Sequence, residues 1–300
     1  MATLTGERSV MNRMREIIDR VSKIPPPSQT VQKLMGIMSN PDHGIQEIIK
    51  IIENDGPLTA QVLKLVNSAS FGLRNKVDSI RRAIMYVGSK TVLGIAIGLS
   101  AGTCYKGSLD GYESGPGGLW EHSLKTAIAA RMLACYTEDK VPEYLAYTGG
   151  ILHDIGKSII SEYLRNTAES IIPAIDGHVF HDYLEAEEKS IGISHNEVGE
   201  MVARKWNFPE SLIAAIKFHH HPEFAPQEFR PLVYCIHLGD FISMACGSGT
   251  GSDDFAYEFD SDYSHFIKVT KDELSYVILD VAQEFEKTRS ALVDNGGANK

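Results

Sequence analysis

The chain has 300 residues, 43% hydrophobic and 23% charged, a composition typical of a globular protein with one large or two medium domains. Its formal net charge of -10 at pH 7, with no basic run, argues against binding to a nucleic-acid polymer, because phosphate contacts require clustered Lys and Arg. The longest uncharged apolar stretch, residues 91–101, is too short to cross a bilayer, and the first residues carry no secretory signal. We therefore expect a cytoplasmic protein with no membrane association.

Apolar residues recur at helical spacing through the first hundred residues, and no hairpin signal interrupts them. Proline, glycine and asparagine divide this pattern into segments, including a turn at 40–42 and a loop at 67–72. Ser28 is a candidate helix cap, and Gly88 occupies a position typical of a left-handed cap. The predicted helices cover residues 11–24, 28–39, 45–53, 58–66, 79–87 and 91–101.

Residues 107–118 contain five glycines and a proline, which predicts a loop or hinge. We place a boundary there, between an amino-terminal helical subdomain (residues 1–112) and a second one (residues 113–247). The remainder, residues 248–300, is predicted to form an acidic loop, a carboxy-terminal helix and a frayed tail. The fold class predicted is all-α, a helical bundle in two subdomains.

The second half continues with amphipathic segments that deliver polar residues to their ends. A helix from residue 142 leads into His153-Asp154, and a capping-box pattern, Ser194 to Glu197, puts His195 at the first position of the next helix. Residues 247–262 are glycine-rich and then acidic, which suggests a mobile loop. The predicted helices cover residues 119–136, 142–152, 182–190, 195–206, 209–218, 231–245 and 271–289.

A set of histidines and aspartates falls on the inner faces or at the ends of five of these helices. A single histidine near a core is more often hydrogen-bonded than metal-bound, but the joint occurrence favours a metal site. One ion rarely takes more than six ligands, so the full set suits two ions, bridged by Asp154 or water, although four members could hold one. The absence of thiolate favours iron or manganese over structural zinc. The set is His122, His153, Asp154, His195, His219, His220 and Asp240.

Four neighbouring residues have two interpretations each. His221 could replace an adjacent histidine as a ligand, and His237 could be a hydrogen-bond donor behind the ligands or fill core space. Glu187 either belongs to a solvated acidic face or turns toward the metals. Lys157 is either a solvated charge or a phosphate-binding residue. Four further histidines lie in polar contexts and are expected at the surface: His43, His178, His181 and His265.

The sequence resembles the HDOD family, a relative of the HD-domain metal-dependent phosphohydrolases, from about residue 24 to residue 246. The amino-terminal half carries the resemblance in residues 24–27 (Ile-Pro-Pro-Pro), 55–59 (Asp-Gly-Pro-Leu-Thr), 67–72 (Asn-Ser-Ala-Ser-Phe-Gly), 83–84 and 87–88. Gly56 departs from the family pattern, in which proline follows the aspartate directly. The seven histidines and aspartates above match the positions of HD-type metal ligands, and the Gly-Tyr-Pro signature of the HD-GYP phosphodiesterases is missing.

The resemblance implies a signal-transduction protein with a helical bundle around a two-metal centre that binds or hydrolyses a phosphorylated small molecule or nucleotide. In the catalytic version, Asp154 and Lys157 are the residues expected to act, with Lys157 steadying a phosphate while metal-activated water attacks phosphorus. The alternative is a non-catalytic interaction module, with a structural or sensory metal site and a signalling protein as its partner.

Overall fold

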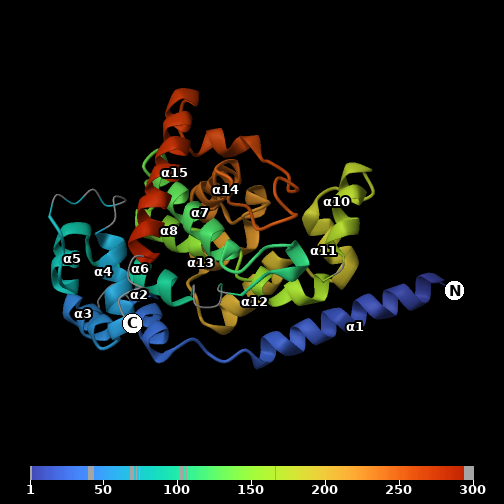
Figure 1. Ribbon diagram of the computed structural model, residues 1–300, viewed down its shortest axis with the longest axis horizontal. Coiled ribbons are helices and arrows are strands. Elements are labelled where there is room, and N and C mark those ends of the chain that lie inside the picture. Colours follow the sequence, from blue (N-terminus) through green and yellow to red (C-terminus); the bar gives the residue numbers. More distant parts are fainter. Residues whose placement is uncertain are drawn as a thin grey trace.

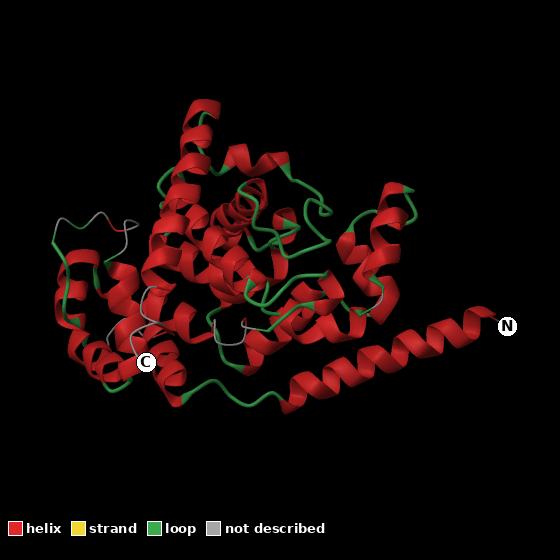
Figure 2. Cartoon of the chain, viewed as in Figure 1, coloured by secondary structure: helices red, strands yellow, loops and turns green. Residues whose placement is uncertain are grey.

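The chain folds as a bundle of helices, as the sequence predicts. The computed structural model describes residues 2–39, 44–67, 71, 73, 75–101, 105, 107–165 and 167–293. Within these residues the only β contacts are two isolated bridges, Leu109 with Ser114 and Thr137 with Ile267, and everything else is helix, turn or loop (Figure 2). The all-α fold class is thereby confirmed.

The first six helices match the predicted segments, with one difference in length. Ser28 accepts a hydrogen bond from the Val31 amide (3.3 Å), which confirms the predicted cap. Gly88 ends its helix with a φ of 88° and a ψ of 154°, so its φ is positive but it does not adopt the predicted left-handed helical cap. The first helix begins at Ala2, nine residues earlier than its apolar pattern does. The turn at 40–42 and most of the loop at 67–72 lie outside the described residues. The helices are α1 (Ala2–Lys23), α2 (Gln29–Ser39), α3 (Ile45–Glu53), α4 (Gly56–Val66), α5 (Ile80–Val87) and α6 (Ser89–Ala101).

The second half contains every predicted helix and short elements that the periodicity did not indicate. The unexpected ones are η3 (Asp110–Tyr112), α9 (Lys157–Ile160), η4 (Ser161–Leu164), α10 (Ala168–Asp176), η5 (Pro222–Phe224), η6 (Gln227–Phe229) and η7 (Ser261–His265). The predicted ones are α7 (Gly118–Ala134), α8 (Glu143–Leu152), α11 (Tyr183–Ile191), α12 (His195–Lys205), α13 (Glu210–Phe218), α14 (Arg230–Ala245) and α15 (Lys271–Val293).

Helices α7, α8 and α14 form the centre of the molecule. Helix α7 packs against both α8 and α14, and α8 also contacts α13 (Figure 1). Helix α6 joins the amino-terminal helices to this centre through its contact with α8, while α15 crosses α7 and α4. Most buried apolar side chains of both halves belong to one continuous cluster, from Ile17 to Phe285, while Ala214, Ala225 and Val233 form a small separate cluster.

Helix α1 lies along the second half of the chain rather than with α2–α6 (Figure 1). It contacts α9, α11 and α12, and Arg13 donates a hydrogen bond to the Ser190 carbonyl (3.1 Å). Lys205 and Trp206, at the end of α12, donate to the carbonyls of Val21 (3.0 Å) and Pro25 (3.2 Å). Helix α1, which precedes position 112, therefore packs with helices that follow it. The subdomain boundary at position 112 stays a prediction.

No single helix among the described residues has both the length and the hydropathy of a membrane span. Helices α5 and α6 meet that test only as a pair, Ile80–Val87 with Ser89–Ser100, and they are bent by 119° relative to each other.

Candidate metal centre

Helix ends and inner helix faces place the seven candidate ligands around one point in the second half. His122 projects from α7 and Asp240 from α14. His153 is the residue that ends α8, and Asp154 lies in the turn before α9. His195 begins α12, and His219 ends α13 with His220 immediately after it. All seven side chains are buried, each residue with no more than 2% of its surface exposed.

Gly156 allows the turn that carries Asp154 to approach α12. A Cβ atom at this position would lie 1.8 Å from the His195 carbonyl oxygen, so no larger residue fits without moving one of the two segments. On the other side of the contact, Glu197 accepts a hydrogen bond from the Ser194 amide (3.1 Å), as the capping-box pattern predicts. The close approach at Gly156 and the capping box together bring His195 and Asp154 within contact distance.

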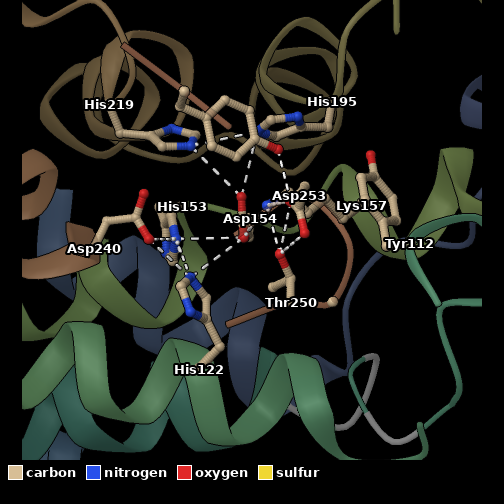
Figure 3. Close-up of polar contacts among 12 residues, drawn as sticks. Tyr112, His122, His153, Asp154, Lys157, His195, His219, Asp240, Thr250 and Asp253 are labelled. Atoms are coloured by element: carbon tan, nitrogen blue, oxygen red, sulfur yellow. Dashed lines mark hydrogen bonds and ion pairs between the residues drawn. The ribbon is translucent and has the colours of Figure 1, made fainter. Parts of the chain in front are cut away.

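The ligating atoms fall into two groups, one of Asp154, His195, His219 and His220 and one of His122, His153 and Asp240 (Figure 3). In one group, His122 Nε2 lies 3.2 Å from His153 Nε2 and 2.9 Å from Asp240 Oδ1. In the other, His195 Nε2 lies 3.4 Å from His219 Nε2 and 3.2 Å from His220 Nε2.

Asp154 lies between the two groups and presents one oxygen to each. Its Oδ1 is 3.3 Å from His195 Nε2 and 3.5 Å from His219 Nε2. Its Oδ2 is 3.4 Å from His153 Nε2 and 3.6 Å from His122 Nε2. Neither oxygen has a hydrogen bond of ordinary geometry, although Lys157 Nζ approaches Oδ2 to 2.8 Å as an ion pair. A buried carboxylate with its lone pairs directed at imidazole nitrogens is well suited to bridge two cations.

Outward-facing hydrogen bonds fix the orientation of most of these imidazoles. The Nδ1 atoms of His122, His153 and His219 lie 2.7–2.8 Å from the carbonyl oxygens of Ser248, Gly150 and Ile216. Because a carbonyl can only accept, each Nδ1 carries a proton, and in the neutral form of each ring Nε2 has a lone pair directed inward. Unprotonated Nε2 atoms at 3.2–3.4 Å repel one another unless a cation lies between them, which is the arrangement of a metal site.

Glu187 supplies the corresponding outward partner for His195, and the sequence did not assign it this role. Its carboxylate accepts from His195 Nδ1 (2.9 Å), from the His195 amide (2.7 Å) and from the Tyr112 hydroxyl (2.6 Å). Glu187 therefore turns inward, as one of the two interpretations proposed. It contacts Nδ1 of the candidate ligand His195 and not the inner group of ligating atoms. Glu187 has no exposed surface, so the solvated-face interpretation is wrong.

The buried charges around the centre do not balance. Four carboxylates, of Asp154, Glu187, Asp240 and Asp253, are at most 2% exposed, and Lys157 is the one buried ammonium in contact with them among the described residues. An excess of buried negative charge costs several kcal/mol unless cations compensate it. Divalent cations held between the His and Asp side chains would fit this donor set and this charge.

The pKa shifts follow from the same crowding. Burial alone would raise the pKa of Asp154, but the Lys157 ammonium and the neighbouring imidazoles hold that pKa well below its ordinary value. Burial lowers the pKa of His219 to about 4, and it lowers the pKa of His220 well below the usual range. These two imidazoles are therefore neutral near pH 7, the form that binds metal.

Lys157 is buried among polar side chains beside the centre. Its Nζ atom lies 2.8 Å from Asp154 Oδ2 and 2.7 Å from Asp253 Oδ2, and it donates to Thr250 Oγ1 at 2.9 Å (Figure 3). Only 2% of the residue is exposed, so the interpretation as a solvated charge is wrong.

The two partners of Lys157 other than Asp154 come from residues 248–257, which we call the covering segment. The sequence suggested a mobile loop here. Instead Ser248, Thr250, Asp253 and Tyr257 are buried against the centre, because Lys157 and His122 supply the charged and polar partners that these side chains require.

The remaining histidines lie outside the centre. His221 faces Asp182 (3.9 Å) and Glu223 (3.6 Å) rather than the ligand groups. His237 Nδ1 donates to the His219 carbonyl (2.7 Å), and its Nε2 accepts from the Asp260 amide (3.0 Å), so it is the hydrogen-bonding residue behind a ligand that one interpretation proposed. His178, His181 and His265 are exposed as expected, and His43 lies outside the described residues.

The fold and the site together define an all-α protein with a buried cluster of histidines and aspartates suited to metal binding. The chain belongs to the HDOD domain family, whose pattern matches residues 24–222. The family assignment made from the sequence is thereby confirmed.

The similar proteins with solved structures share this fold. An HDOD domain protein of unknown function from Geobacter sulfurreducens is 22% identical, with a TM-score of 0.70, and the match covers 95% of this chain and 97% of that one. A protein from Shewanella amazonensis SB2B, provisionally described as a phosphohydrolase, is also 22% identical, with a TM-score of 0.66 and coverage of 92% and 98%. At these identities the likeness establishes the fold alone.

One relative known from its sequence is longer. An uncharacterised protein of Treponema pallidum (strain Nichols) is 28% identical over 222 residues, which make up 72% of this chain and 41% of that protein. The chain thus matches less than half the length of this relative.

Proposed function

We propose that the seven buried side chains bind two divalent metal ions, and that the protein is a signal-transduction protein whose centre binds or hydrolyses a phosphorylated small molecule or nucleotide. The observation that carries this proposal is the position of Asp154, with one oxygen toward each histidine group and no hydrogen bond of ordinary geometry at either oxygen. The His and carboxylate donors, without any thiolate, favour iron or manganese.

Residues of the chain have distinct roles in such a reaction. The two ions supply Lewis acidity for the attack of water on phosphorus and neutralise the phosphoryl oxygens. Lys157, whose ammonium lies 2.8 Å from Asp154, holds a phosphoryl oxygen next to the centre. Glu187 keeps the proton of His195 on Nδ1, so that Nε2 faces inward.

A regulatory scaffold is the second candidate, and the enclosure of the centre favours it. No ligand residue is more than 2% exposed, and the covering segment lies against Lys157, the residue proposed to hold phosphate. In this candidate the metal site stabilises the fold or senses the metal, and the protein acts by binding a signalling protein.

Elemental analysis after anaerobic purification, with iron and manganese supplied, tests the shared part of both candidates. We expect about two ions per chain in the wild type, as a two-metal site requires. His219→Gln should lower the content, whereas His265→Gln, at an exposed histidine, should not. Fewer than one ion per chain in the wild type would count heavily against a two-metal centre.

A turnover screen with bis(4-nitrophenyl) phosphate and with cyclic and linear nucleotides separates the two candidates. Metal-dependent turnover that Asp154→Ala abolishes supports the hydrolase. Bound metal without turnover of any substrate, in the wild type and in Asp154→Ala alike, supports the scaffold.

A further inference from the structure

The covering segment places a carboxylate against the proposed phosphate-binding lysine. Asp253 has no exposed surface, and its Oδ2 lies 2.7 Å from Lys157 Nζ (Figure 3). The hydroxyls of Thr250 (2.7 Å) and Tyr257 (2.7 Å) donate to the same carboxylate, so both partners come from the segment itself. Asp253 is thus held in place mainly by its own segment on one side and by Lys157 on the other.

Asp253 belongs to neither group of candidate metal ligands. The groups consist of Asp154, His195, His219 and His220, and of His122, His153 and Asp240. Lys157 lies between Asp253 and the centre, because its ammonium contacts Asp154 on one side and Asp253 on the other. The Asp253 carboxylate therefore fills an anion position that borders the centre without forming part of it.

A limited set of contacts holds the covering segment to the rest of the protein. The Ser248 amide donates to the Ser243 carbonyl (3.1 Å), the Ser252 amide donates to the Tyr112 carbonyl (2.7 Å), and the Tyr183 amide donates to the Ala256 carbonyl (2.8 Å). The Ser248 carbonyl also accepts from His122 Nδ1 (2.7 Å), and the Tyr257 ring stacks on the His220 ring with the centroids 3.8 Å apart. The segment contains no helix, since it lies between α14 and η7. Its displacement requires the loss of these contacts and of the Asp253 ion pair with Lys157, and it leaves every helix intact.

We propose that Asp253 is an internal competitor for the anion position beside Lys157, and that a phosphate group of a ligand displaces it and moves the covering segment away from the centre. This inference rests on the proposed function, which makes Lys157 a phosphate-binding residue. It assigns the ligand a phosphate mono- or diester, since a phosphate group offers several anionic oxygens where Asp253 offers one carboxylate. The enclosed form is then the resting state, which phosphate opens.

Asp253→Asn tests this inference, because it keeps the shape of the side chain and removes its charge. Lys157 keeps Asp154 as its partner in this variant, so no buried ammonium is left unpaired. Asp254→Asn is the matched control: it removes the same charge from the next residue, which is exposed and does not contact Lys157. Thermal melting establishes that both variants fold.

Calorimetry on the metal-loaded protein, with inorganic phosphate as the probe, gives the first readout. We expect Asp253→Asn to bind phosphate about tenfold more tightly than the wild type, because the competing closed state is lost. Asp254→Asn should match the wild type, and a further Lys157→Gln change in the Asp253→Asn background should abolish the gain. Equal phosphate affinity in Asp253→Asn and the wild type overturns the inference.

Hydrogen–deuterium exchange on the wild type gives a second readout that needs no variant. Phosphate should speed amide exchange in residues 248–257 while leaving α7 and α14 unchanged. Exchange in the covering segment that is unaffected or slowed by phosphate at saturation argues that Asp253 is a fixed structural partner of Lys157.

The two proposals fail in different ways. If no substrate is turned over but phosphate binds more tightly to Asp253→Asn and speeds exchange, the competitor role stands and hydrolysis does not. If substrates are turned over with the same KM in Asp253→Asn and the wild type, hydrolysis stands and the competitor role does not.

Discussion

At the scale of single residues, the hydrogen bonds behind the candidate ligands matter as much as the ligands. Three histidines rest on backbone carbonyls, which no substitution of a side chain can remove. His195 differs, because it rests on the side chain of Glu187. Glu187 is therefore the position where the orientation of a ligand can be changed without touching the ligand.

We expect Glu187→Gln to lower the affinity for metal by about 10- to 100-fold, the usual effect of losing a carboxylate behind a ligating histidine. A chelator competition titration measures the change. Glu188→Gln, at the exposed neighbouring position, is the control and should leave the affinity unaltered. A loss of stability in the metal-free protein with unchanged metal affinity would show that Glu187 only supports the fold.

The protonation of His219 gives the metal-free protein a pH-dependent stability. Because burial lowers the pKa of His219 to about 4 from an ordinary 6.5, the unfolded chain binds a proton more readily than the folded one between these values. This contribution is fully present above pH 6.5 and is lost as the pH falls to about 4. It amounts to about 3 kcal/mol at most.

Denaturant unfolding of the metal-free protein between pH 7 and pH 4.5 measures this effect. The wild type should lose stability across this range, and His219→Gln should show a shallower loss. His122 acts in the opposite direction, since its Asp240 hydrogen bond raises its pKa despite burial, so only the difference between the two proteins is diagnostic. Parallel slopes would contradict the assignment of His219 as a buried neutral imidazole.

At the scale of elements, the sequence predicted most helices well because their apolar residues recur with a clear period. It gave no indication of α9 and η4, which are four residues each, too short for periodicity to be read. It also suggested that residues 247–262 are mobile, since they contain glycine and acidic residues and no apolar stripe. The ion pair of Asp253 with Lys157 joins residues 96 positions apart, and a pair of this kind leaves no local pattern.

The residues of the candidate site also differ in how far local sequence pattern could identify them. The residues at helix ends and inner faces could be selected because charged side chains in apolar surroundings stand out in a sequence. Glu187 could not be assigned its position, because it lies among other acidic residues on α11 and differs from them only in its tertiary contacts. The one available signal was its place on the apolar side of that helix.

The contact between the Asp154 turn and α12 predicts a large effect of one methyl group. Gly156→Ala should destabilise the protein by about 3 kcal/mol, because the new Cβ would lie 1.8 Å from the His195 carbonyl. It should also reduce metal content, since relief of the clash separates Asp154 from His195. Gly115→Ala is the control, because its Cβ would meet no atom within 4 Å. Denaturant titrations that superimpose for the two variants would refute the close contact.

At the scale of the whole molecule, the centre draws on elements from nearly the entire second half and is braced by segments from outside it. Helix α1 packs on α9 and α12, which flank Asp154 and His195, and α15 packs on α7, which carries His122. The apolar core that supports these helices is continuous through α6 into the amino-terminal helices. Loss of packing by α1 or α15 therefore shifts the helices that carry the candidate ligands.

In the proposed two-metal centre, the position of Asp154 between the two histidine groups would make the two ion positions thermodynamically dependent on each other. Binding at one Asp154 oxygen would fix the carboxylate and so prepare its other oxygen for the second site. Titration of the metal-free protein should be cooperative, with few singly loaded molecules at half saturation. Asp154→Asn should convert it to weak, independent binding, and hyperbolic loading of the wild type would contradict the coupling. The protein would then pass between metal-free and fully loaded forms over a narrow range of metal concentration, as a switch for metal supply does.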